Sequence, residues 1–298
     1  YWALGQTIKV RDVATGNQLH TLPGPGGYGL EPVWSPDGRH LACVGDDGSI
    51  VLYDAEKGVR VRSWQHEGVK VSLTEDPNQG VNVAWHPDGR QLASTSIKVS
   101  TVRIWDISTG DELSSFEAGC AAGSNTAVAW SPDGQRLAVG GGGSVEIWDR
   151  VGWRRLHTIE ADARHLGWSH DGRYLATGSK ILDTFTGRVA QTLSGHTGNV
   201  QIAGWSEDGR RIATVGQDGV RMWNVKTGQE MFSLGDAKAM AWSHDRKRIA
   251  TISSGTIRVY DASIGYEMAN DLSDQRQRSR AGELVSEAFS LARNGHFE

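Results

Sequence analysis

Short runs of alternating apolar and polar residues cover most of this chain. The segment 7–11 alternates in this way, which is the pattern of a half-buried β-strand, and the segments 126–130, 136–139 and 144–148 are short, mostly apolar runs of strand length. The runs are separated by short segments rich in glycine, proline, aspartate and serine, where the backbone can turn. The pattern therefore predicts many short antiparallel strands and an all-β fold.

A tryptophan that ends one of these runs recurs along the chain and marks a repeat. Serine or histidine follows it at once, and aspartate follows three positions after it, as in the segment 205–209. The six copies begin at Trp34, Trp85, Trp130, Trp168, Trp205 and Trp242. Self-similarity at a period of roughly forty residues indicates a repeat architecture.

A second landmark follows each tryptophan turn. It is an aspartate or asparagine at the end of an apolar run, followed by a turn that glycine closes. The copies are Asp54, Asp106, Asp149, Asp183, Asn224 and Asp261, with an additional copy at Asp12. The chain therefore carries seven second halves of the repeat and six first halves.

Each complete unit predicts four strands: one before the tryptophan, one after its turn, one ending at the second landmark, and one after the glycine. Four short antiparallel strands cannot bury both faces alone, so the units must stack on one another. Radial stacking of four-stranded sheets is a β-propeller. Two departures stand out: an enlarged connection at 66–80, expected as a mobile loop or small hairpin, and a shortened turn between Gly178 and Asp183. We expect a site shaped by asymmetry near the shortened turn.

These repeats resemble the WD-repeat family of β-propellers over about residues 1–270. The resemblance implies a polar network of a histidine, a hydroxyl on the second strand, an aspartate in the next turn, and the tryptophan of the second landmark. The sixth unit carries this set whole, as His196, Thr214, Asp218 and Trp223. The other units match in part, so packing is expected to hold them more than the network does.

The resemblance also favours seven blades, the commonest number in the family. The first blade would then be incomplete, because its first half is missing from the sequence. A six-bladed propeller, in which the N-terminal strands complete the last sheet, stays open as the alternative.

The tail from Asp271 has a different character. Residues 274–280 are polar and basic, which is typical of a linker. One helical stripe then follows, made of Leu284, Val285, Ala288, Leu291 and Ala292. We expect residues 271–298 to form a polar linker and an amphipathic helix, which resembles the start of a tetratricopeptide-type helical domain. The helix either packs on the propeller of residues 1–270 or begins another domain.

Composition narrows the classes of protein. The 298 residues include 12 tryptophans and are 38% hydrophobic, enough for a substantial core. A net charge of −4 with interspersed signs does not favour a nucleic-acid or membrane surface. No apolar run is long enough to span a membrane and no signal peptide opens the chain, so we expect a cytoplasmic location. Because residue 1 is Tyr, we expect a piece of a longer protein.

No motif for catalysis emerges. The glycines at 140–143 precede a strand, whereas a phosphate loop precedes a helix, so they are interpreted as a turn. Cys43 and Cys120 are too few for a disulfide framework; Cys43 is expected buried, and Cys120 in a loop that could be exposed. No histidine pair has a metal-ligand spacing, and no nucleophile signature occurs. We predict no enzyme activity, no metal and no cofactor.

The residues predicted to bind a partner lie in the loops of one rim, the usual interaction surface of the family. The loops before first strands supply Tyr28, Asn125, Asp162, Asn199 and Asp236. The turns between second and third strands supply Asp46, Asp47, Lys98, Lys180 and Gln217. Any one of these can be an ordinary exposed loop residue, and we expect several to act together.

Three functions are weighed. The favoured one is a protein-interaction or ligand-sensing scaffold of a larger, bacterial signalling protein, with a protein or peptide partner and covalently linked domains on both sides. The second is a nucleic-acid-associated propeller, which the negative net charge disfavours. The third is a propeller-fold hydrolase, which would need converging carboxylates or a metal site that no motif here supplies.

Overall fold

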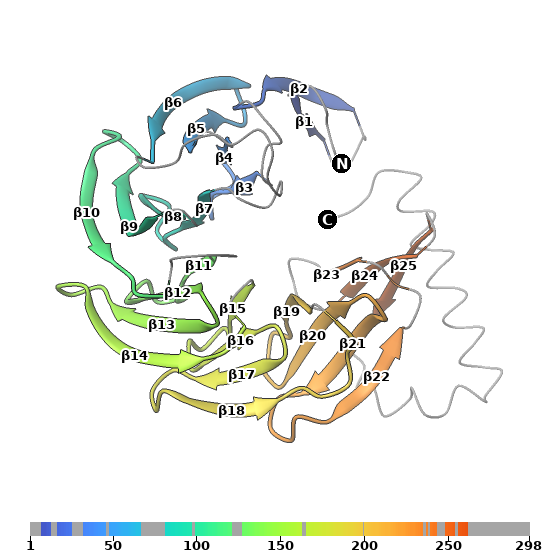
Figure 1. The fold of residues 1–298 in the computed structure, drawn as a ribbon. Helices are drawn as coiled ribbons and strands as arrows, with labels where there is room; N and C mark the ends of the chain where they lie inside the picture. Colours follow the sequence, from blue (N-terminus) through green and yellow to red (C-terminus); the bar gives the residue numbers. More distant parts are fainter. Residues whose placement is uncertain are drawn as a thin grey trace. The chain divides into compact units, whose positions relative to one another are not determined.

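The computed structural model describes the following residues of the chain: 7–12, 17–25, 32–45, 48–66, 81–96, 99–120, 127–162, 165–198, 200–234, 237, 239–242, 248–253 and 256–261. These residues form β-strands joined by turns, and no helix occurs among them (Figure 1). The prediction of an all-β fold is confirmed. The helix predicted in 271–298 lies outside the described residues.

Five sheets have four antiparallel strands each, in the predicted order along the chain. The first comprises β3 (Val33–Trp34), β4 (His40–Val44), β5 (Ser49–Asp54) and β6 (Val59–Gln65). The second comprises β7 (Val81–Trp85), β8 (Gln91–Ser96), β9 (Val99–Asp106) and β10 (Glu112–Glu117). The third comprises β11 (Ala127–Trp130), β12 (Arg136–Gly141), β13 (Ser144–Asp149) and β14 (Arg154–Glu160).

The two remaining four-stranded sheets follow in sequence. One comprises β15 (Leu166–Trp168), β16 (Tyr174–Thr177), β17 (Lys180–Asp183) and β18 (Arg188–Thr192). The other comprises β19 (Gln201–Trp205), β20 (Arg211–Gly216), β21 (Gly219–Asn224) and β22 (Glu230–Leu234). The hairpin β16–β17 closes directly at the pair Thr177 and Lys180, which confirms the predicted shortening of this turn.

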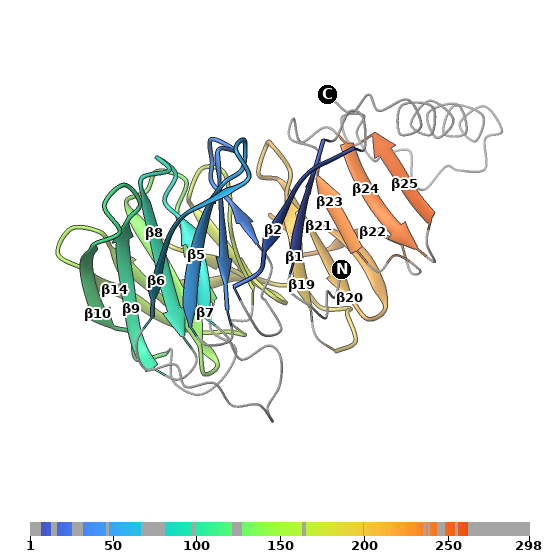
Figure 2. The ribbon, with the colours of Figure 1, turned by 90° about the horizontal axis from the view of Figure 1, so that it is seen from above.

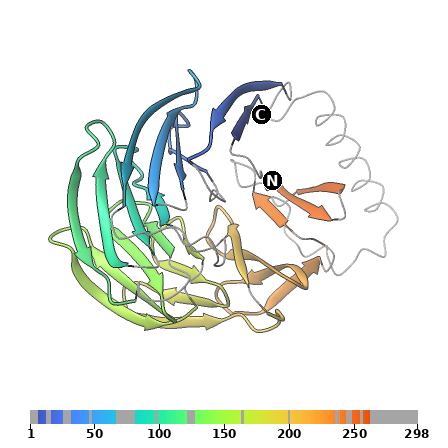
Figure 3. The ribbon, with the colours of Figure 1, turned by 45° about the horizontal axis from the view of Figure 1, so that its top comes forward.

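Two smaller sheets complete the described strands. β1 (Thr7–Arg11) pairs with β2 (Gln18–Pro23), shown in blue in Figure 3. β23 (Ala239–Trp242), β24 (Arg248–Ser253) and β25 (Thr256–Asp261) form the last sheet, orange to red in Figure 2. Within the described ranges β1 and β2 pair with each other and not with the last sheet. The number of blades stays a prediction.

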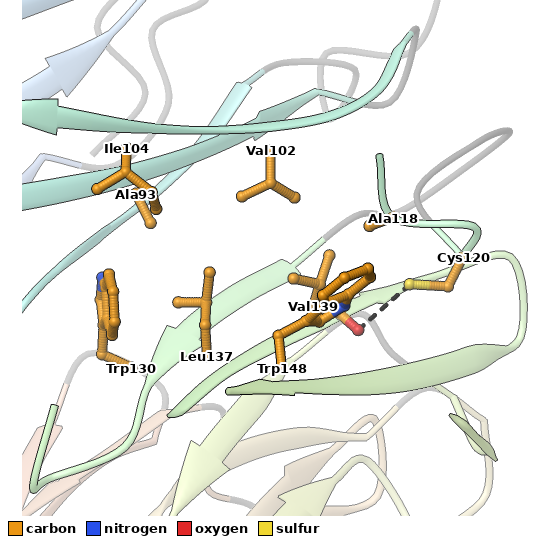
Figure 4. Packing of buried hydrophobic residues seen from close by; sticks show 9 residues of the cluster. All are labelled: Ala93, Val102, Ile104, Ala118, Cys120, Trp130, Leu137, Val139 and Trp148. Carbon is orange, nitrogen blue, oxygen red and sulfur yellow. Dashed lines mark hydrogen bonds between the residues drawn. The ribbon is translucent and has the colours of Figure 1, made fainter. Parts of the chain in front are cut away.

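The chain divides into two compact units. The first contains residues 1–11, 18–168 and 184–188, and the second contains 12–17, 169–183 and 189–298. In the first unit, the core is built where the face of one sheet packs on the next. Ala93 and Ile104 of sheet β7–β10 face Trp130 and Leu137 of sheet β11–β14 (Figure 4). Apolar residues at alternating positions create these contacts, as the sequence pattern predicts.

In the second unit the same packing recurs. Ile181 belongs to the same cluster as Trp205 and Trp223 of sheet β19–β22, and Met222 of that sheet packs with Ile249. All of these side chains are almost fully buried. Each sheet thus depends on its neighbours for burial, which is the property of a stacked repeat.

In the part of the chain that the structure describes, the tryptophan turns have one geometry where serine follows the tryptophan. The Ser206 hydroxyl donates to Asp208 Oδ1 at 2.6 Å, and the Arg211 N–H donates to Ser206 Oγ at 3.0 Å. The same bonds form at Ser35, Ser131 and Ser169. Together with a backbone N–H, the serine hydrogen bond lowers the pKa of Asp208 despite partial burial. The motif is therefore explained by turn stability.

A side chain on the outer strand holds the next glycine turn. His20 on β2 contacts the Glu56 carbonyl through Nε2 at 2.8 Å, and Arg62 Nη2 on β6 donates to the Ser108 carbonyl at 2.7 Å. In the second unit, Gln191 Nε2 on β18 donates to the Lys226 carbonyl at 2.7 Å. We call these contacts the turn latches. They join consecutive sheets through polar atoms outside the apolar core.

The turn latches explain why glycine closes these turns. A Cβ added at Gly110 would lie 2.6 Å from Arg62 Cδ, and one at Gly228 would lie 2.9 Å from Gln191 Oε1. Both glycines also have a positive φ, which disfavours other residues. The glycine is required both for the turn and for the approach of the latch.

Two expectations about single side chains are corrected. His66 was placed at the start of a mobile loop, but it is fully buried at the end of β6, where its N–H donates to the Gly48 carbonyl. Cys120 is buried rather than exposed, because it packs in the apolar cluster around Trp148, where its Sγ donates to the Val139 carbonyl at 3.3 Å (Figure 4). Burial raises the pKa of both Cys43 and Cys120 to about 12. The remainder of the enlarged connection, 67–80, lies outside the described residues.

Candidate functional site

Four side chains of the second unit form a continuous chain of hydrogen bonds, which we call the His196 network. The Trp223 indole N–H donates to Thr214 Oγ1 at 2.7 Å, and the Thr214 hydroxyl donates to His196 Nε2 at 2.8 Å. His196 Nδ1 donates to Asp218 Oδ1 at 2.6 Å. Since Nε2 accepts the hydroxyl proton, the ring proton is assigned to Nδ1.

Asp218 ends the network and carries its charge. Its Oδ2 accepts a hydrogen bond from Arg221 Nη2 at 2.8 Å and from the Thr197 N–H at 3.3 Å. The hydrogen bond from His196, supported by Arg221, holds the pKa of Asp218 well below its usual value. The carboxylate is therefore ionised at neutral pH and fixes the turn between β20 and β21.

A hydroxyl, an imidazole and a carboxylate in this order also occur in hydrolase active sites. Here Thr214 is fully buried, and its oxygen already accepts the indole N–H of Trp223. A nucleophile needs access to the substrate, which this hydroxyl lacks. The His196 network therefore stabilises the sheet, and its geometry does not support a reaction.

Gln217 is an exposed residue next to the His196 network, in the turn between β20 and β21. Asp218 follows it and is held by the bonds described above. Gly216 precedes it and leaves no room for a larger residue, because an added Cβ would lie 2.6 Å from Asp218 Oδ1. Gln217 is exposed, and Gly198 of the adjoining loop approaches it. A rigid turn of this kind is suited to binding, because little conformational freedom is lost.

The other predicted rim residues are placed as follows. Lys180 lies half-buried at the start of β17, in the second unit, and Asp162 lies exposed after β14, in the first unit. Seven predicted residues lie outside the described residues, namely Tyr28, Asp46, Asp47, Lys98, Asn125, Asn199 and Asp236. A partner-binding role for all ten residues stays a prediction.

Sheet β11–β14 holds a charged pair that the sequence analysis did not predict. Glu146 on β13 is 2% exposed and accepts a hydrogen bond from Arg155 Nη1 at 2.8 Å. Its second oxygen accepts the Trp148 indole N–H. A buried carboxylate requires such partners, because an unpaired charge in the interior is costly.

The same positions carry the opposite charges in two other sheets. Arg103 pairs with Glu112 in sheet β7–β10, and Arg221 pairs with Glu230 in sheet β19–β22. In all three sheets the partners are nine residues apart. This constant spacing between opposite charges is the signal in the sequence that could have revealed the pair.

An aromatic and basic cluster in the first unit was also missed. The Arg136 guanidinium lies 5.2 Å from the ring centroid of Trp168 and 4.7 Å from that of Phe185. Arg136 Nη1 also donates to Thr184 Oγ1 at 2.8 Å. The ring of Phe185 remains largely exposed. No periodic pattern in the sequence brings these residues together, because they belong to successive repeats.

Two classes of site find no support in the structure. Throughout the part of the chain that the structure describes, no three His, Cys, Asp or Glu side chains could together hold a metal ion. Nor do these residues include a helix long and apolar enough to cross a membrane. The surface features above are thus the candidates for function.

Comparison with protein families agrees with the geometry of the repeats. The family model of the WD domain, G-beta repeat, matches residues 16–54 and 187–224, and the second match contains the whole His196 network. These two segments are WD repeats. The sheets of the chain are those of a WD-repeat β-propeller, as the sequence resemblance implies. The model of the eukaryotic translation initiation factor eIF2A also matches the chain, over residues 83–185.

Curated relatives of this chain are 26% to 29% identical to it over the aligned residues. Over 180 residues, 28% are identical to the protein HIR1 of Cryptococcus neoformans, covering 55% of this chain and 20% of HIR1. Over 151 residues, 26% are identical to pre-mRNA-processing factor 19 homolog 2 of Arabidopsis thaliana, covering 50% of this chain and 27% of that protein.

A third relative is WD repeat-containing protein 1 of Gallus gallus. It is 29% identical over 207 residues, which cover 64% of this chain and 34% of the relative. In all three cases the aligned part is no more than about a third of the relative. The likeness therefore concerns the repeats and not the relatives as whole proteins.

Proposed function

We propose that this chain is a non-catalytic scaffold that binds a protein or peptide partner through the loop rim of its propeller. The observation that carries the proposal is the exposed Gln217, held between Gly216 and the fixed Asp218. A stable framework that presents polar loop residues is a common basis of protein recognition. WD-repeat relatives support a scaffold of this kind, and the buried Thr214 argues against catalysis by the His196 network.

The proposal includes the wider setting of the scaffold. We propose that it is the sensing part of a larger bacterial signalling protein and that it acts in the cytoplasm, where its scattered charges would be solvated. Lys180, in the same unit as Gln217, is proposed to contribute to binding together with it, and Asp162 is proposed as a separate contact on the first unit. A nucleic-acid partner is the alternative, and the net charge of −4 disfavours it.

Affinity capture from a native lysate tests the proposal. The parent chain is compared with a variant carrying Gln217→Ala, Lys180→Ala and Asp162→Ala. A control variant carries Glu207→Ala and Gln135→Ala, which alter exposed residues in the tryptophan turns, at the other edge of the sheets. All three samples must first show the same melting temperature.

We expect a protein that the parent and the control capture and the rim variant loses. Equal capture by all three samples would overturn the assignment to the rim. Capture of nucleic acid that falls steeply between low and moderate salt would overturn the protein partner in favour of the alternative.

A further inference from the structure

The turns between third and fourth strands differ in one exposed position. The second residue after the landmark aspartate or asparagine is polar in three sheets, as Glu56, Ser108 and Lys226. In the successive sheets β11–β14 and β15–β18 it is Val151 and Phe185, which are 77% and 66% exposed. These two side chains are the most exposed of the large apolar residues in the described ranges, and exposed apolar area of this kind can mark an interaction site where it is contiguous.

Phe185 is held in place by its neighbours. The Arg136 guanidinium lies against its ring and also against the ring of Trp168. Trp168 is itself fixed, because its indole N–H donates to the Ala129 carbonyl at 3.0 Å. A cation between two aromatic rings restrains all three groups. Phe185 is therefore an ordered apolar side chain on the surface of the first unit.

In two other sheets the residue that matches Arg136 is a histidine or a tyrosine. His40 stacks on Trp85 at 6.4 Å, and Tyr174 stacks on Trp205 at 6.5 Å. At these three positions the first residue of the second strand thus lies against the next tryptophan. Arg136 differs from His40 and Tyr174 because its guanidinium also lies against the exposed ring of Phe185.

Positive charge accompanies the two apolar side chains. In sheet β11–β14, Arg136, Asp149 and Arg154 lie in one row across β12, β13 and β14. Asp149 accepts the Val151 N–H at 2.9 Å, which places Val151 beside this row, and Arg154 is 76% exposed at 3.9 Å from Asp149. The row has a net charge of +1, and an exposed ion pair contributes little by itself.

We propose that Phe185, Val151, Arg136 and Arg154 form a second docking surface, for an acidic peptide segment that carries bulky apolar side chains. The apolar side chains cover Phe185 and Val151, and the carboxylates face Arg154 and Arg136. This surface lies where β12 begins and β13 ends, at the edge of the sheet opposite the turn between β12 and β13. It thus goes beyond the rim proposed above.

A labelled synthetic peptide tests this proposal on the whole chain by fluorescence anisotropy. The peptide holds one phenylalanine and two leucines among six glutamates. One control peptide replaces glutamate by lysine, and another replaces the apolar residues by serine. The protein variants are Phe185→Ser, Phe185→Leu and Arg154→Glu. Lys226→Ser, at the matching turn of sheet β19–β22, serves as the control variant.

We expect the acidic peptide to bind the parent and Lys226→Ser equally, and Phe185→Ser about tenfold more weakly, since one apolar contact of this size is lost. Phe185→Leu retains most of the affinity, which separates loss of contact from loss of fold. Arg154→Glu weakens binding, and more so at low salt.

Three results would overturn the docking surface: equal binding to Phe185→Ser, equal binding of the lysine peptide, or no binding of the acidic peptide at millimolar concentration. Gln217, Lys180 and Asp162 are unchanged in all of these variants. A negative result with the peptide therefore does not bear on the rim proposal. A rim variant that still captures the partner likewise does not bear on this docking surface.

Discussion

Glu146 accepts the indole N–H of Trp148, two residues later on β13, with Oε2 and Nε1 3.1 Å apart. In sheet β7–β10 the matching indole, that of Trp105, donates instead to the Ser94 hydroxyl at 2.8 Å. The position of Ser94 is taken in sheet β11–β14 by Val139, which offers no acceptor on its side chain. A carboxylate on the neighbouring strand thus replaces the missing hydroxyl.

This replacement predicts coupling between Glu146 and Val139. Glu146→Ala should lower the free energy of unfolding by about 2–3 kcal/mol, because the buried indole N–H of Trp148 loses its acceptor. Val139→Thr should destabilise the parent, and less so in the Glu146→Ala background, where its hydroxyl can accept from Trp148. Urea unfolding of the two single variants and the double variant gives the coupling, expected near 1 kcal/mol. Additive effects would show that Val139 does not occupy the acceptor position.

Sheet β15–β18 provides the inverse case. Thr177 on β16 matches Thr214 on β20. The position of Trp223, the donor to Thr214, is taken in sheet β15–β18 by Leu182, which has no N–H on its side chain. Among the described residues, the buried Thr177 hydroxyl has no hydrogen-bond partner. We expect Thr177→Val to leave the free energy of unfolding unchanged or to raise it.

The matched substitution Thr214→Val should lower the free energy of unfolding by about 2–3 kcal/mol, since it removes two hydrogen bonds of the His196 network. Both variants are nearly isosteric, so packing changes little. Chemical denaturation compares them directly. A loss at Thr177→Val as large as that at Thr214→Val would mean that both hydroxyls have partners.

The turn latches predict a contrast between two glycines. Gly110 and Gly152 have similar φ values of 82° and 72°, so alanine strains the backbone similarly at both. Arg62 covers Gly110, whereas a Cβ at Gly152 would meet nothing within 4 Å. Gly110→Ala should therefore cost about 1 kcal/mol more than Gly152→Ala. Equal losses in thermal unfolding would show that Arg62 moves aside freely.

Asp218 predicts a dependence of stability on pH. Its pKa in the folded protein lies below the usual value of 3.8 for an aspartate, so its contribution to stability is complete above about pH 5 and is lost as pH falls through the folded pKa. Other aspartates also titrate in this range, and the variant Asp218→Asn isolates the effect. The difference in unfolding free energy between the parent and Asp218→Asn should shrink between about pH 5 and pH 3. A difference that stays constant would contradict a charged Asp218 in the network.

Sequence patterns predicted much of this fold because they act within one repeat. The short apolar runs bounded by turn residues predicted the strands around Trp130, and the shortened segment before Asp183 predicted the tight hairpin. His196 and Trp223 could be assigned because the whole network lies in one unit. The rim could be predicted by register, but which loop residues bind a partner depends on chemistry that repetition does not encode.

What escaped prediction depends on contacts between repeats or on exchanged roles. Arg136 meets Phe185 from the following repeat, and His20 reaches the turn of the next sheet. Glu146 stands where the other two sheets have an arginine, and Arg155 stands where they have a glutamate. A search for identical residues at matching positions therefore does not find this pair. Cys120 is buried because it packs in the apolar cluster with Ala118, Val139 and Trp148, which its position in a loop does not reveal.

The turn latches define how this protein could be cut and rejoined. A boundary drawn between two sheets separates an outer strand from the turn that it holds. For example, it separates β18 from the turn after β21, although Gln191 of β18 donates a hydrogen bond to that turn. A cassette that starts with an outer strand and ends in the turn held by it keeps both halves of the contact. The segment 187–224, one match of the repeat model, has nearly this frame. Exchanging repeats within that frame keeps the turn latches at the junctions. Exchanging whole sheets instead breaks one turn latch at each end of the exchanged segment.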